Sequence, residues 1–248
     1  MGHSYSAQYF TDKIAREGAD AVYEALEIAS LEALPTDRDG YSVTIPYKEA
    51  ILPYLSSLDP VAKQIGAVNV VKGTKGYNTD WIGFTRSIQP LLHARDTHAL
   101  VLGTGGAAKA VVYALQQLGL TTDVVSRKSL VVRGTPKIGR FFGEAPVSRW
   151  SLVDSVKVYT YSELKAEDMQ RWQVIVNCTP VGMWPKTEEC PDIPYQGLTP
   201  EHLLFDCIYN PEETLFLRHG REKGARTKNG MEMLLIQADE AWKIWNKE

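Results

Sequence analysis

The amino-acid sequence predicts an α/β protein with two domains, and three observations support this prediction. Short apolar runs alternate with segments in which apolar residues recur every three or four positions, as in parallel sheets covered by helices. A glycine-rich turn occupies residues 103–108, in the middle of the chain. Roughly 95 residues precede the strand before this turn and need a fold of their own. A chain of 248 residues is long enough for two such domains.

The first third of the sequence contains the elements of a smaller domain. Ser6 can cap a helix that Gly18 ends. Residues 21–28 and 41–45 are apolar enough for strands, and the second of them stops before Pro46. The expected elements are, in order, a helix at 7–17, strands at 21–28 and 41–45, short amphipathic helices at 47–55 and 60–65, a hairpin of 68–72 and 76–78, and a helix at 81–92.

The rest of the sequence alternates strands and helices, which implies a parallel sheet. Residues 129–155 interrupt the pattern with many Arg, Gly and Pro residues and little periodicity, so we expect a long surface loop there, either a functional insertion or partly mobile. The expected elements are, in order, a strand at 97–102, a helix at 107–118, strands at 123–126, 174–178 and 203–208, and helices at 213–223 and 231–245.

The turn at 103–108 has the strand–turn–helix context of a dinucleotide-binding site. Gly103 allows a tight turn, Gly105 lets the backbone approach a pyrophosphate, and Ala108 permits close packing of the helix on the strand. The phosphates would lie at the helix N-terminus, where unpaired N–H groups and the dipole favour an anion. Arg127 and Lys128 follow the next strand, where an NAD enzyme has an acidic residue, so the sequence predicts NADP as the cofactor.

Composition and charge argue against several other classes of protein. A net charge of −3 gives no electrostatic case for binding nucleic acid or an anionic membrane. The three cysteines, at positions 178, 190 and 207, are too few and too scattered for a disulfide framework or a zinc site, so no metal is expected. No apolar stretch approaches a membrane span and no signal-peptide core is visible, which makes the cytoplasm the expected location.

Two polar clusters near the N-terminus are candidate ligand-binding sites. Ser4 and Ser6 are two residues apart, so in an extended segment both hydroxyls point to the same side. They can therefore bind one hydroxylated or carboxylated ligand. The alternative is a helix cap at Ser6 and a solvated Ser4. Thr44 and Lys48 flank a proline at the carboxyl end of a strand, the usual edge for α/β active sites. Lys48 is therefore a candidate general acid/base or carboxylate anchor, against the alternative of a solvated surface lysine.

A third cluster contains Asn69, Thr79 and Asp80, near strand and hairpin ends. Asp80 precedes the helix expected at 81–92, so one interpretation is a helix N-cap. The other is a carboxylate partner for Lys48, in a pair that orients a substrate hydroxyl.

Six motifs, in a fixed order, resemble those of the shikimate dehydrogenase family over nearly the whole chain apart from residues 129–155. This resemblance implies a substrate domain over 1–82, completed by a C-terminal helix at 230–248 that returns to it. It also implies an NADP-binding Rossmann domain over 83–229. The motifs are SVTIPYK at 42–48, GAVN at 66–69, GYNTD with GF at 76–84, GTGGAAKA at 103–110, VNCTPVGM at 176–183 and GMEMLLIQA at 230–238.

The resemblance also implies roles for individual residues. Lys48 and Asp80 match the catalytic pair that contacts the ring hydroxyls, and the paired serines match those that hold the substrate carboxylate. The positions that match substrate-binding residues are Ser4, Ser6, Thr44, Asn69, Tyr209 and Gln237. The positions that match the cofactor site are Gly103, Gly105, Gly106, Ala107, Arg127 and Lys128, with Thr179 and Met183 on the nicotinamide side.

The reaction that the resemblance implies is the reversible reduction of 3-dehydroshikimate by NADPH to shikimate, in chorismate and aromatic amino acid biosynthesis. Hydride goes to C3 of the ring, Lys48 donates the proton to the developing alkoxide, and Asp80 holds Lys48 and a neighbouring hydroxyl. The expected partners are this small-molecule substrate and NADP, with neither nucleic acid nor membrane, in a monomer or homodimer.

Two departures from the family pattern lie near the N-terminus. Family members begin with an apolar strand before the H-S-x-S motif, whereas this sequence starts at Met1-Gly2-His3. Our hypothesis is that the natural start lies upstream and that an extended chain melts at a higher temperature, because the added strand would pair backbone groups of the sheet. The segment between Ile28 and Tyr41 is also shorter than the resemblance leads us to expect.

Three alternative functions remain beside this prediction. One is a quinate/shikimate dehydrogenase of relaxed specificity. Arg127 and Lys128 argue against relaxed cofactor use, and the paired serines favour shikimate over quinate. A non-catalytic ligand-sensing relative, weakened by a missing first strand, is opposed by the intact Lys48 and Asp80. The folate-linked methylene dehydrogenases also pair a lysine with a Rossmann domain, but the doubled serine and the Asn-Thr-Asp sequence do not suit them.

Overall fold

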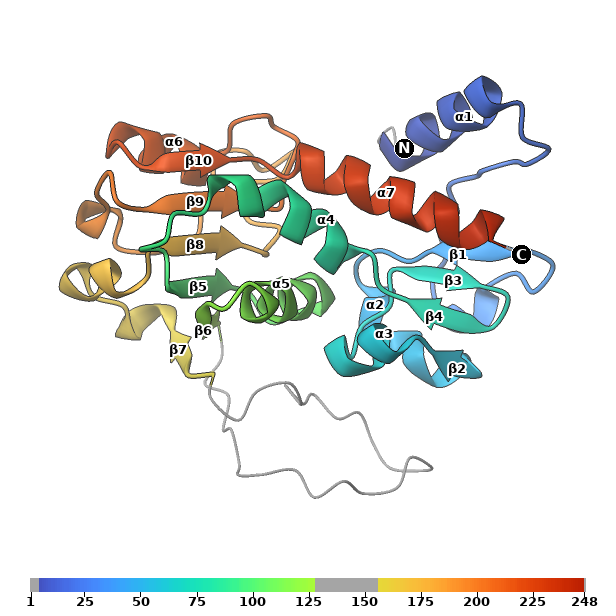
Figure 1. The fold of residues 1–248 in the computed structure, drawn as a ribbon, viewed down its shortest axis with the longest axis horizontal. Helices are drawn as coiled ribbons and strands as arrows, with labels where there is room; N and C mark the ends of the chain where they lie inside the picture. The colour runs from blue at the N-terminus through green and yellow to red at the C-terminus, as the bar shows by residue number, and fades with distance from the viewer. Residues whose placement is uncertain (1–4, 128–155, 248) are drawn as a thin grey trace, which may run out of the picture.

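The computed structural model describes residues 5–127 and 156–247 of the chain. Figure 1 shows two lobes, each built around its own sheet. The larger lobe carries a six-stranded parallel sheet, and the smaller lobe carries a four-stranded mixed sheet. The α/β fold with two separate sheets that the sequence predicts is therefore confirmed.

The six-stranded sheet has the strand order β10-β9-β8-β5-β6-β7, and all of its neighbouring strands run parallel. From the centre of the sheet, β5, β6 and β7 follow one another toward one edge, and β8, β9 and β10 follow one another toward the other edge. This is the Rossmann order. The reversal leaves a topological switch point between β5 and β8, where α/β proteins bind ligands. The strands are β5 His98–Leu102, β6 Thr121–Ser126, β7 Val158–Thr160, β8 Val174–Asn177, β9 Leu203–Asp206 and β10 Arg226–Lys228.

Helices cover both faces of this sheet. Phe84 of α4 and Val111 of α5 pack on one face together with Met233 of α7. Phe216 of α6 and the buried Trp172 pack on the other. Burial on both faces explains why the central strands are nearly continuous runs of Val, Ile and Leu. The helices are α4 Asp80–Ile88, α5 Gly106–Gln117, α6 Leu215–Glu222 and α7 Met231–Asn246, with 3-10 helices at Gln89–Leu91, Tyr161–Glu163, Ala166–Arg171 and Tyr195–Gly197.

The smaller sheet has the order β1-β3-β4-β2, and the predicted hairpin lies at its centre, where β3 and β4 pair antiparallel. Helix α3 begins where the Asp59 carboxylate accepts a hydrogen bond from the Val61 N–H at 2.9 Å, and it ends at Gly66 in a left-handed conformation, with φ +71°. The elements are β1 Gly40–Ser42, α2 Tyr47–Ala50, β2 Ser57–Leu58, α3 Pro60–Ile65, β3 Val70–Lys72 and β4 Lys75–Tyr77, with 3-10 helices at Leu31–Ala33 and Leu52–Tyr54.

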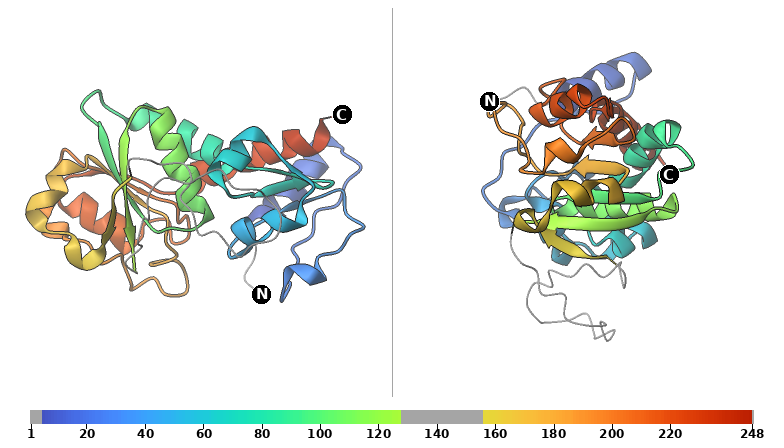
Figure 2. Two further views of the ribbon diagram at one scale, coloured as in Figure 1. Left: turned by 90° about the horizontal axis from the view of Figure 1, so that it is seen from below. Right: turned by 90° about the vertical axis from the view of Figure 1, so that its left-hand side faces the viewer.

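The last helix, α7, joins the two lobes, as the resemblance implied; Figures 1 and 2 show its path. Met233 near its start packs in the core of the larger sheet. Trp245 near its end donates a hydrogen bond from Nε1 to the Val71 carbonyl of β3 at 2.9 Å. Helix α1 (Tyr5–Glu17) lies beside α7 and buries Phe10 against Trp245, with ring centroids 5.2 Å apart.

The strand expected at 21–28 is wrong. This segment is irregular, and Val22 and Leu26 are 83% and 47% exposed. Within it, only Tyr23 and Ile28 are half-buried, and the Tyr23 ring stacks on Phe10 at 4.5 Å. A strand needs a neighbour to pair its N–H and C=O groups, and none of the strands that the structure describes pairs with this segment. Apolar composition alone therefore does not make it a strand.

Most other expected elements agree with the structure to within a few residues, and the helix at 60–65 has the expected bounds. Ser6 lies inside α1 and does not cap it. The helix expected at 47–55 divides into α2 and a 3-10 turn, because Pro53 has no N–H to continue an α-helix. Strands β2, β7 and β10 were not expected, since two or three residues carry too little pattern. The predicted loop at 129–155 lies outside the described residues.

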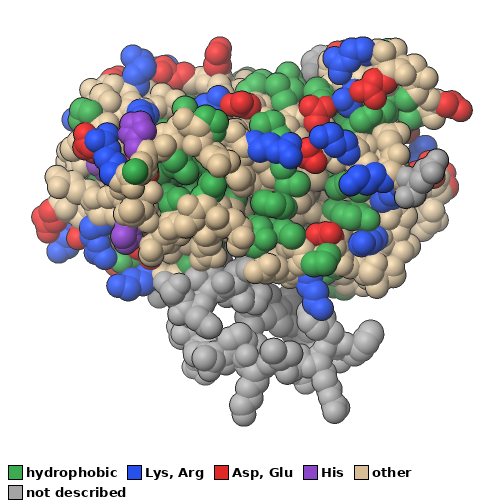
Figure 3. Space-filling view, in the orientation of Figure 1, with side chains coloured by type: hydrophobic (Ala, Val, Ile, Leu, Met, Phe, Trp, Pro, Cys, Tyr) green, Lys and Arg blue, Asp and Glu red, His purple; other side chains and the backbone are tan. Residues whose placement is uncertain are grey.

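The surface carries both signs of charge. Figure 3 shows acidic and basic side chains interspersed on one face of the molecule, in keeping with the net charge of −3. Over residues 5–127 and 156–247, no helix has the length and apolar character needed to cross a membrane. The same ranges contain no group of three or more His, Cys, Asp and Glu side chains arranged to hold a metal ion.

Candidate active site

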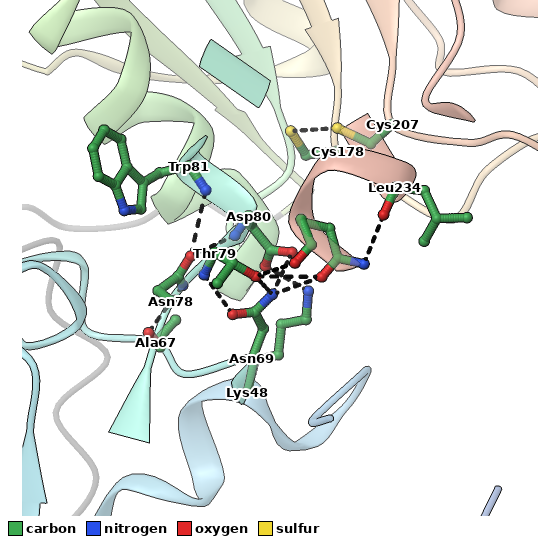
Figure 4. Close-up of polar contacts among 11 residues, drawn as sticks. Lys48, Ala67, Asn69, Asn78, Thr79, Asp80, Trp81, Cys178, Cys207 and Leu234 are labelled. Carbon is green, nitrogen blue, oxygen red and sulfur yellow. Dashed lines mark hydrogen bonds and ion pairs between the residues drawn. The ribbon is translucent and has the colours of Figure 1, made fainter. Parts of the chain in front are cut away.

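Lys48 and Asp80 meet where the two lobes join, as Figure 4 shows. Lys48 lies in the short helix α2, and Asp80 is the first residue of α4. The Lys48 Nζ donates a hydrogen bond to the Asp80 Oδ2 at 2.6 Å, and the two side chains are only 15% and 6% exposed. The prediction that Asp80 pairs with Lys48 is therefore correct, and the alternative of an N-cap is wrong, because Thr79 occupies the N-cap position.

Asn69 holds the other oxygen of the Asp80 carboxylate. Its side-chain amide nitrogen lies 3.0 Å from Asp80 Oδ1 and 2.9 Å from the Thr79 hydroxyl. Its side-chain carbonyl accepts a hydrogen bond from the Thr79 N–H at 2.7 Å. Asn69 and Thr79 are both buried, so the carboxylate has fixed partners on both oxygens. This arrangement fixes the direction in which Asp80 presents its oxygen to Lys48.

Gln237 brings α7 to the same cluster. The Thr79 hydroxyl donates a hydrogen bond to the Gln237 backbone carbonyl at 2.9 Å, and the Asn69 amide lies 3.1 Å from the Gln237 side-chain oxygen. The Gln237 amide in turn donates to the Leu234 carbonyl at 3.0 Å. Of the substrate-binding residues expected from the sequence, the structure therefore brings Asn69 directly to Asp80, and Gln237 reaches the same cluster through Asn69 and Thr79.

Asn78 supports the cluster, and the sequence analysis missed it. Its side-chain carbonyl accepts a hydrogen bond from the Asp80 N–H at 3.0 Å, and its amide donates to the Ala67 carbonyl at 3.0 Å. Asn78, the residue before the N-cap Thr79, thereby ties the first turn of α4 to the loop before β3. An asparagine directly before a helix N-cap is a local signal that could have identified it.

The glycine-rich turn lies at the switch point of the large sheet. Gly103 follows β5 with φ +111°, and a Cβ on it would come within 3.2 Å of the Thr179 side chain. Among the described residues, no side chain caps α5, and a Cβ on Gly105 would meet no atom within 4 Å. The open space before an uncapped helix N-terminus fits a pyrophosphate. The residues present therefore suit the cofactor that the sequence predicts.

The other expected cofactor residues surround this turn at the carboxyl edge of the sheet. Arg127 follows β6 and is exposed, whereas Lys128 lies outside the described residues. Thr179 follows β8, and its N–H and hydroxyl donate hydrogen bonds to the Asn177 side-chain oxygen at 3.0 Å and 2.7 Å. Met183 is exposed in the loop that follows. Gly106 and Ala107 form the first turn of α5.

Three of the remaining expected substrate residues, Thr44, Ser6 and Tyr209, are described by the structure, and the fourth is Ser4. Thr44 is exposed between β1 and α2, and Ser6 is half-buried in the first turn of α1. Tyr209 follows β9, and its ring lies 5.8 Å from that of Tyr5; burial raises the pKa of Tyr209. Ser4 lies outside the described residues. For Thr44, Ser6 and Tyr209, hydrogen bonds within the described part of the chain provide no link to Lys48 or Asp80.

Buried titratable groups lie behind the site on the ends of β8 and β9. The Cys178 and Cys207 sulfurs are 3.7 Å apart, and burial raises the pKa of the Cys178 thiol. Burial also raises the pKa of Asp206 to about 7, although its oxygens accept hydrogen bonds from Thr214, Asn177 and the Ile208 N–H. The sequence analysis did not single out Asp206, because the burial that shifts it depends on both sheet faces being covered.

Comparison with known proteins supports the resemblance. A family model described as "Shikimate dehydrogenase substrate binding domain" matches residues 1–71. A protein of Moorella thermoacetica named "Shikimate dehydrogenase (NADP(+))" is 37% identical over 98% of this chain and 84% of its own length. A protein of Aquifex aeolicus with the same name is also 37% identical, over 98% of this chain and 87% of its own.

Solved structures give the same result. The crystal structure of shikimate dehydrogenase from Aquifex aeolicus matches with a TM-score of 0.80 and 36% identity, over 98% of this chain and 88% of that one. The Thermus thermophilus shikimate 5-dehydrogenase, solved in complex with NADP(H) and shikimate, matches with a TM-score of 0.78 and 30% identity. This match covers 98% of this chain and 89% of that one.

Proposed function

Because this chain belongs to the shikimate dehydrogenase family, we propose that it catalyses the reversible, NADP-dependent reduction of 3-dehydroshikimate to shikimate. The reaction belongs to chorismate and aromatic amino acid biosynthesis. The observation that carries the proposal is the Lys48–Asp80 pair, 2.6 Å apart and facing the lobe with the cofactor turn. Relatives that span nearly the whole chain are named NADP-dependent shikimate dehydrogenases, which makes the chain an oxidoreductase of this kind.

We assign a different role to each of the two lobes. We assign residues 1–82, together with the C-terminal helix region 230–248, to the substrate domain, and residues 83–229 to the NADP-binding domain. The boundary falls within α4, which starts with Asp80 beside the substrate and ends in the core of the larger lobe. The two sheets and the path of α7 support this division.

In the reducing direction, C3 of the ring gains hydride and its oxygen gains a proton. NADPH, when bound, supplies the hydride. The Lys48 ammonium is the proton donor: as the C3 carbonyl becomes an alkoxide, one Nζ–H bond breaks and one O–H bond forms. Asp80 accepts a hydrogen bond from Lys48, so it holds the Nζ in place before transfer. In the oxidising direction, Lys48 takes the hydroxyl proton.

Substrate specificity would come from polar groups around this pair. Asn69 and Gln237 sit beside Asp80 and can bind ring hydroxyls. We assign the substrate carboxylate to the hydroxyls of Ser4 and Ser6, with Thr44 and Tyr209 completing the site. Two serines, in place of bulkier hydroxyl residues, favour shikimate over quinate.

The cofactor would lie across the carboxyl edge of the large sheet. Its pyrophosphate would accept hydrogen bonds from backbone N–H groups of the first turn of α5. A 2′-phosphate would pair with the cationic side chains that follow β6, and the nicotinamide would lie beside the residues that follow β8. The residues we assign to this site are Gly103, Gly105, Gly106, Ala107, Arg127, Lys128, Thr179 and Met183.

The protein's partners would be small molecules. The Thermus thermophilus relative was solved with NADP(H) and shikimate, which supports the same pair of ligands here. A cytoplasmic location and a monomeric or homodimeric state stay predictions from the sequence.

The test is NADPH formation, followed by absorbance, when the purified protein meets shikimate and NADP⁺. Quinate and NAD⁺ run in parallel in all combinations. Turnover with shikimate and NADP⁺ at a kcat/KM at least about tenfold above every other pair would support the proposal. Comparable turnover of quinate would identify the relaxed-specificity enzyme instead. Shikimate binding in a calorimeter without turnover would identify a ligand-sensing relative.

A further inference from the structure

A partly buried ion pair links the two lobes beside Lys48. The Lys109 Nζ, from the first turn of α5, lies 2.5 Å from the Glu49 Oε2 of α2. The Lys109 side chain is only 7% exposed, whereas that of Glu49 is 37% exposed. Glu49 directly follows Lys48 in the same short helix, so the pair joins the helix that carries the proton donor to the helix that would hold the cofactor phosphates.

Two further contacts bring α5 against the smaller lobe. A Cβ on Gly106, the first residue of α5, would lie 2.8 Å from the Lys48 Cβ and 3.2 Å from the Ala67 Cβ. The lobes therefore touch at the N-terminus of α5, with the Lys48 side chain against it. In addition, Ile65 and Ala67 pack against Ala110 of α5 in one apolar cluster. These contacts take part in setting the position of Lys48 relative to α5.

The placement of Lys109 is unfavourable for the helix itself. A cation in the first turn opposes the helix dipole, and a nearly buried ammonium loses hydration. The contact with Glu49 offsets both costs, but a hydrophobic residue in the same place would avoid them. Stability of α5 alone therefore does not account for this charge, which suggests a role in joining the lobes.

We propose that the Lys109–Glu49 ion pair is a positioning device that fixes Lys48 relative to the cofactor-binding N-terminus of α5. This proposal rests on the proposed function. Hydride and proton must reach the same carbonyl, one from the cofactor side and one from Lys48, so the two helices need a defined separation. A misplacement of about 1 Å between reacting groups costs up to about a hundredfold in rate. Neither Lys109 nor Glu49 touches the substrate; both act through the position of Lys48.

The decisive variant is Lys109→Met, which keeps the length of the side chain and removes its charge. The freed Glu49 is partly exposed and can turn to water, so the variant should fold. We expect kcat to fall at least about tenfold, while KM for shikimate and Kd for NADP⁺ stay within about threefold of wild type. The deuterium isotope effect with NADPH labelled at the transferred position should rise, because hydride transfer becomes slower than product release.

Conservative and neutral variants separate positioning from folding. Lys109→Arg should recover kcat to within about threefold of wild type, since it restores the charge. The double variant Lys109→Met with Glu49→Gln carries no unpaired charge, and it should show the same loss of kcat as Lys109→Met alone. Lys13→Met is the matched control, because Lys13 is also nearly buried, with a 10% exposed side chain, and pairs with Asp239 in α7. Its kcat at saturating shikimate should stay within about twofold of wild type.

Two results would overturn the proposal. One is an unchanged kcat in Lys109→Met, which would make the pair purely structural. The other is a loss of NADP⁺ affinity of about tenfold or more, which would make Lys109 a cofactor ligand. Hydrogen exchange at the amides of α2 and of the first turn of α5 gives a readout independent of activity, and it should quicken in Lys109→Met but not in Lys13→Met. A wild-type protein without turnover would refute the proposed function alone, while the exchange measurement would still decide whether the ion pair fixes the two helices.

Discussion

The side-chain amide of Asn69 lies 3.1 Å from the side-chain oxygen of Gln237, although 168 positions separate the two residues. Asn69 directly precedes β3 of the small sheet, and Gln237 lies in the helix that returns from the large sheet. Since Asn69 also contacts the Asp80 carboxylate at 3.0 Å, the last helix is linked through Asn69 to the Lys48–Asp80 pair, to which we assign the proton transfer.

Gln237→Ala should therefore lower kcat/KM for shikimate while the protein still folds. The change removes a partly buried amide that faces Asn69 and the proposed ring-hydroxyl site, worth about 1 kcal/mol for one hydrogen bond. We expect kcat/KM for shikimate to fall roughly tenfold, mainly through KM, with KM for NADP⁺ unchanged. Steady-state kinetics with each substrate varied measures this. Gln116→Ala, at the far end of α5, is the control, and an unchanged kcat/KM in Gln237→Ala would contradict the assignment.

Lys48→Met should remove proton transfer and leave cofactor binding intact. General acid/base groups contribute typically about a hundredfold to ten-thousandfold to rate, so kcat should fall at least about a hundredfold. Kd for NADP⁺, measured by calorimetry, should stay within about threefold, because Lys48 lies on the opposite lobe from the cofactor turn. The exposed Lys165 provides the control variant Lys165→Met. A Lys48→Met protein that keeps most of its kcat would refute the role of this residue.

Arg127→Ala tests the cofactor assignment. An ion-paired hydrogen bond to a phosphate is worth about 1.5–3 kcal/mol, so KM for NADP⁺ should rise about tenfold to a hundredfold. NAD⁺ lacks the 2′-phosphate, and its KM should change less than about twofold. The comparison needs both cofactors at saturating shikimate, with the exposed Arg171→Ala as control. Equal losses for the two cofactors would show that Arg127 does not contact the 2′-phosphate.

Asp206 should make stability depend on pH between about 4 and 7. Burial raises the pKa of Asp206 from 3.8 to about 7, so the folded protein holds a proton that the unfolded chain has released in this range. The free energy of unfolding therefore falls as pH rises from about 4 to about 7, by an amount on the order of 4 kcal/mol at most. Asp206→Asn removes this contribution while keeping acceptors for Asn177 and the Ile208 N–H.

The measurement is Tm at several pH values from 5 to 8 for wild type and Asp206→Asn. We expect Tm to fall less with rising pH in the variant than in the wild type. Asp168→Asn, at a partly exposed carboxylate on the surface, should leave the wild-type dependence unchanged. Identical pH dependence in wild type and Asp206→Asn would show that Asp206 titrates near its ordinary value when folded.

The sequence correctly predicted the elements whose signals are local. The glycine turn, helix α3 and the β3–β4 hairpin all depend on neighbouring residues, and each lies where it was expected. The strand predicted at 21–28 is absent for a non-local reason. Its residues have strand composition, but a strand also needs a partner, and the position of a partner is a property of the whole fold.

In the candidate site, too, the sequence identified individual residues, and the structure alone gave their contacts. Motifs identified Lys48, Asp80, Asn69 and Gln237 individually, and the resemblance to a family gave their roles. Their contacts, such as the 2.6 Å between Lys48 and Asp80, came only from the structure. Asn78 and the Lys109–Glu49 pair had no assigned role in the sequence analysis, because an asparagine or a charged residue has the same appearance in a sequence whether it is solvated or buried.

The sequence by itself thus determined the α/β class, the position of the cofactor turn and the family. These follow from periodicity, glycine spacing and ordered motifs, which are encoded along the chain. Only the tertiary structure decided which side chains meet across the two lobes, which carboxyl groups are buried, and which apolar segment remains without a strand partner. Those properties depend on contacts between residues far apart in the sequence, and desolvation and pairing are set by such contacts.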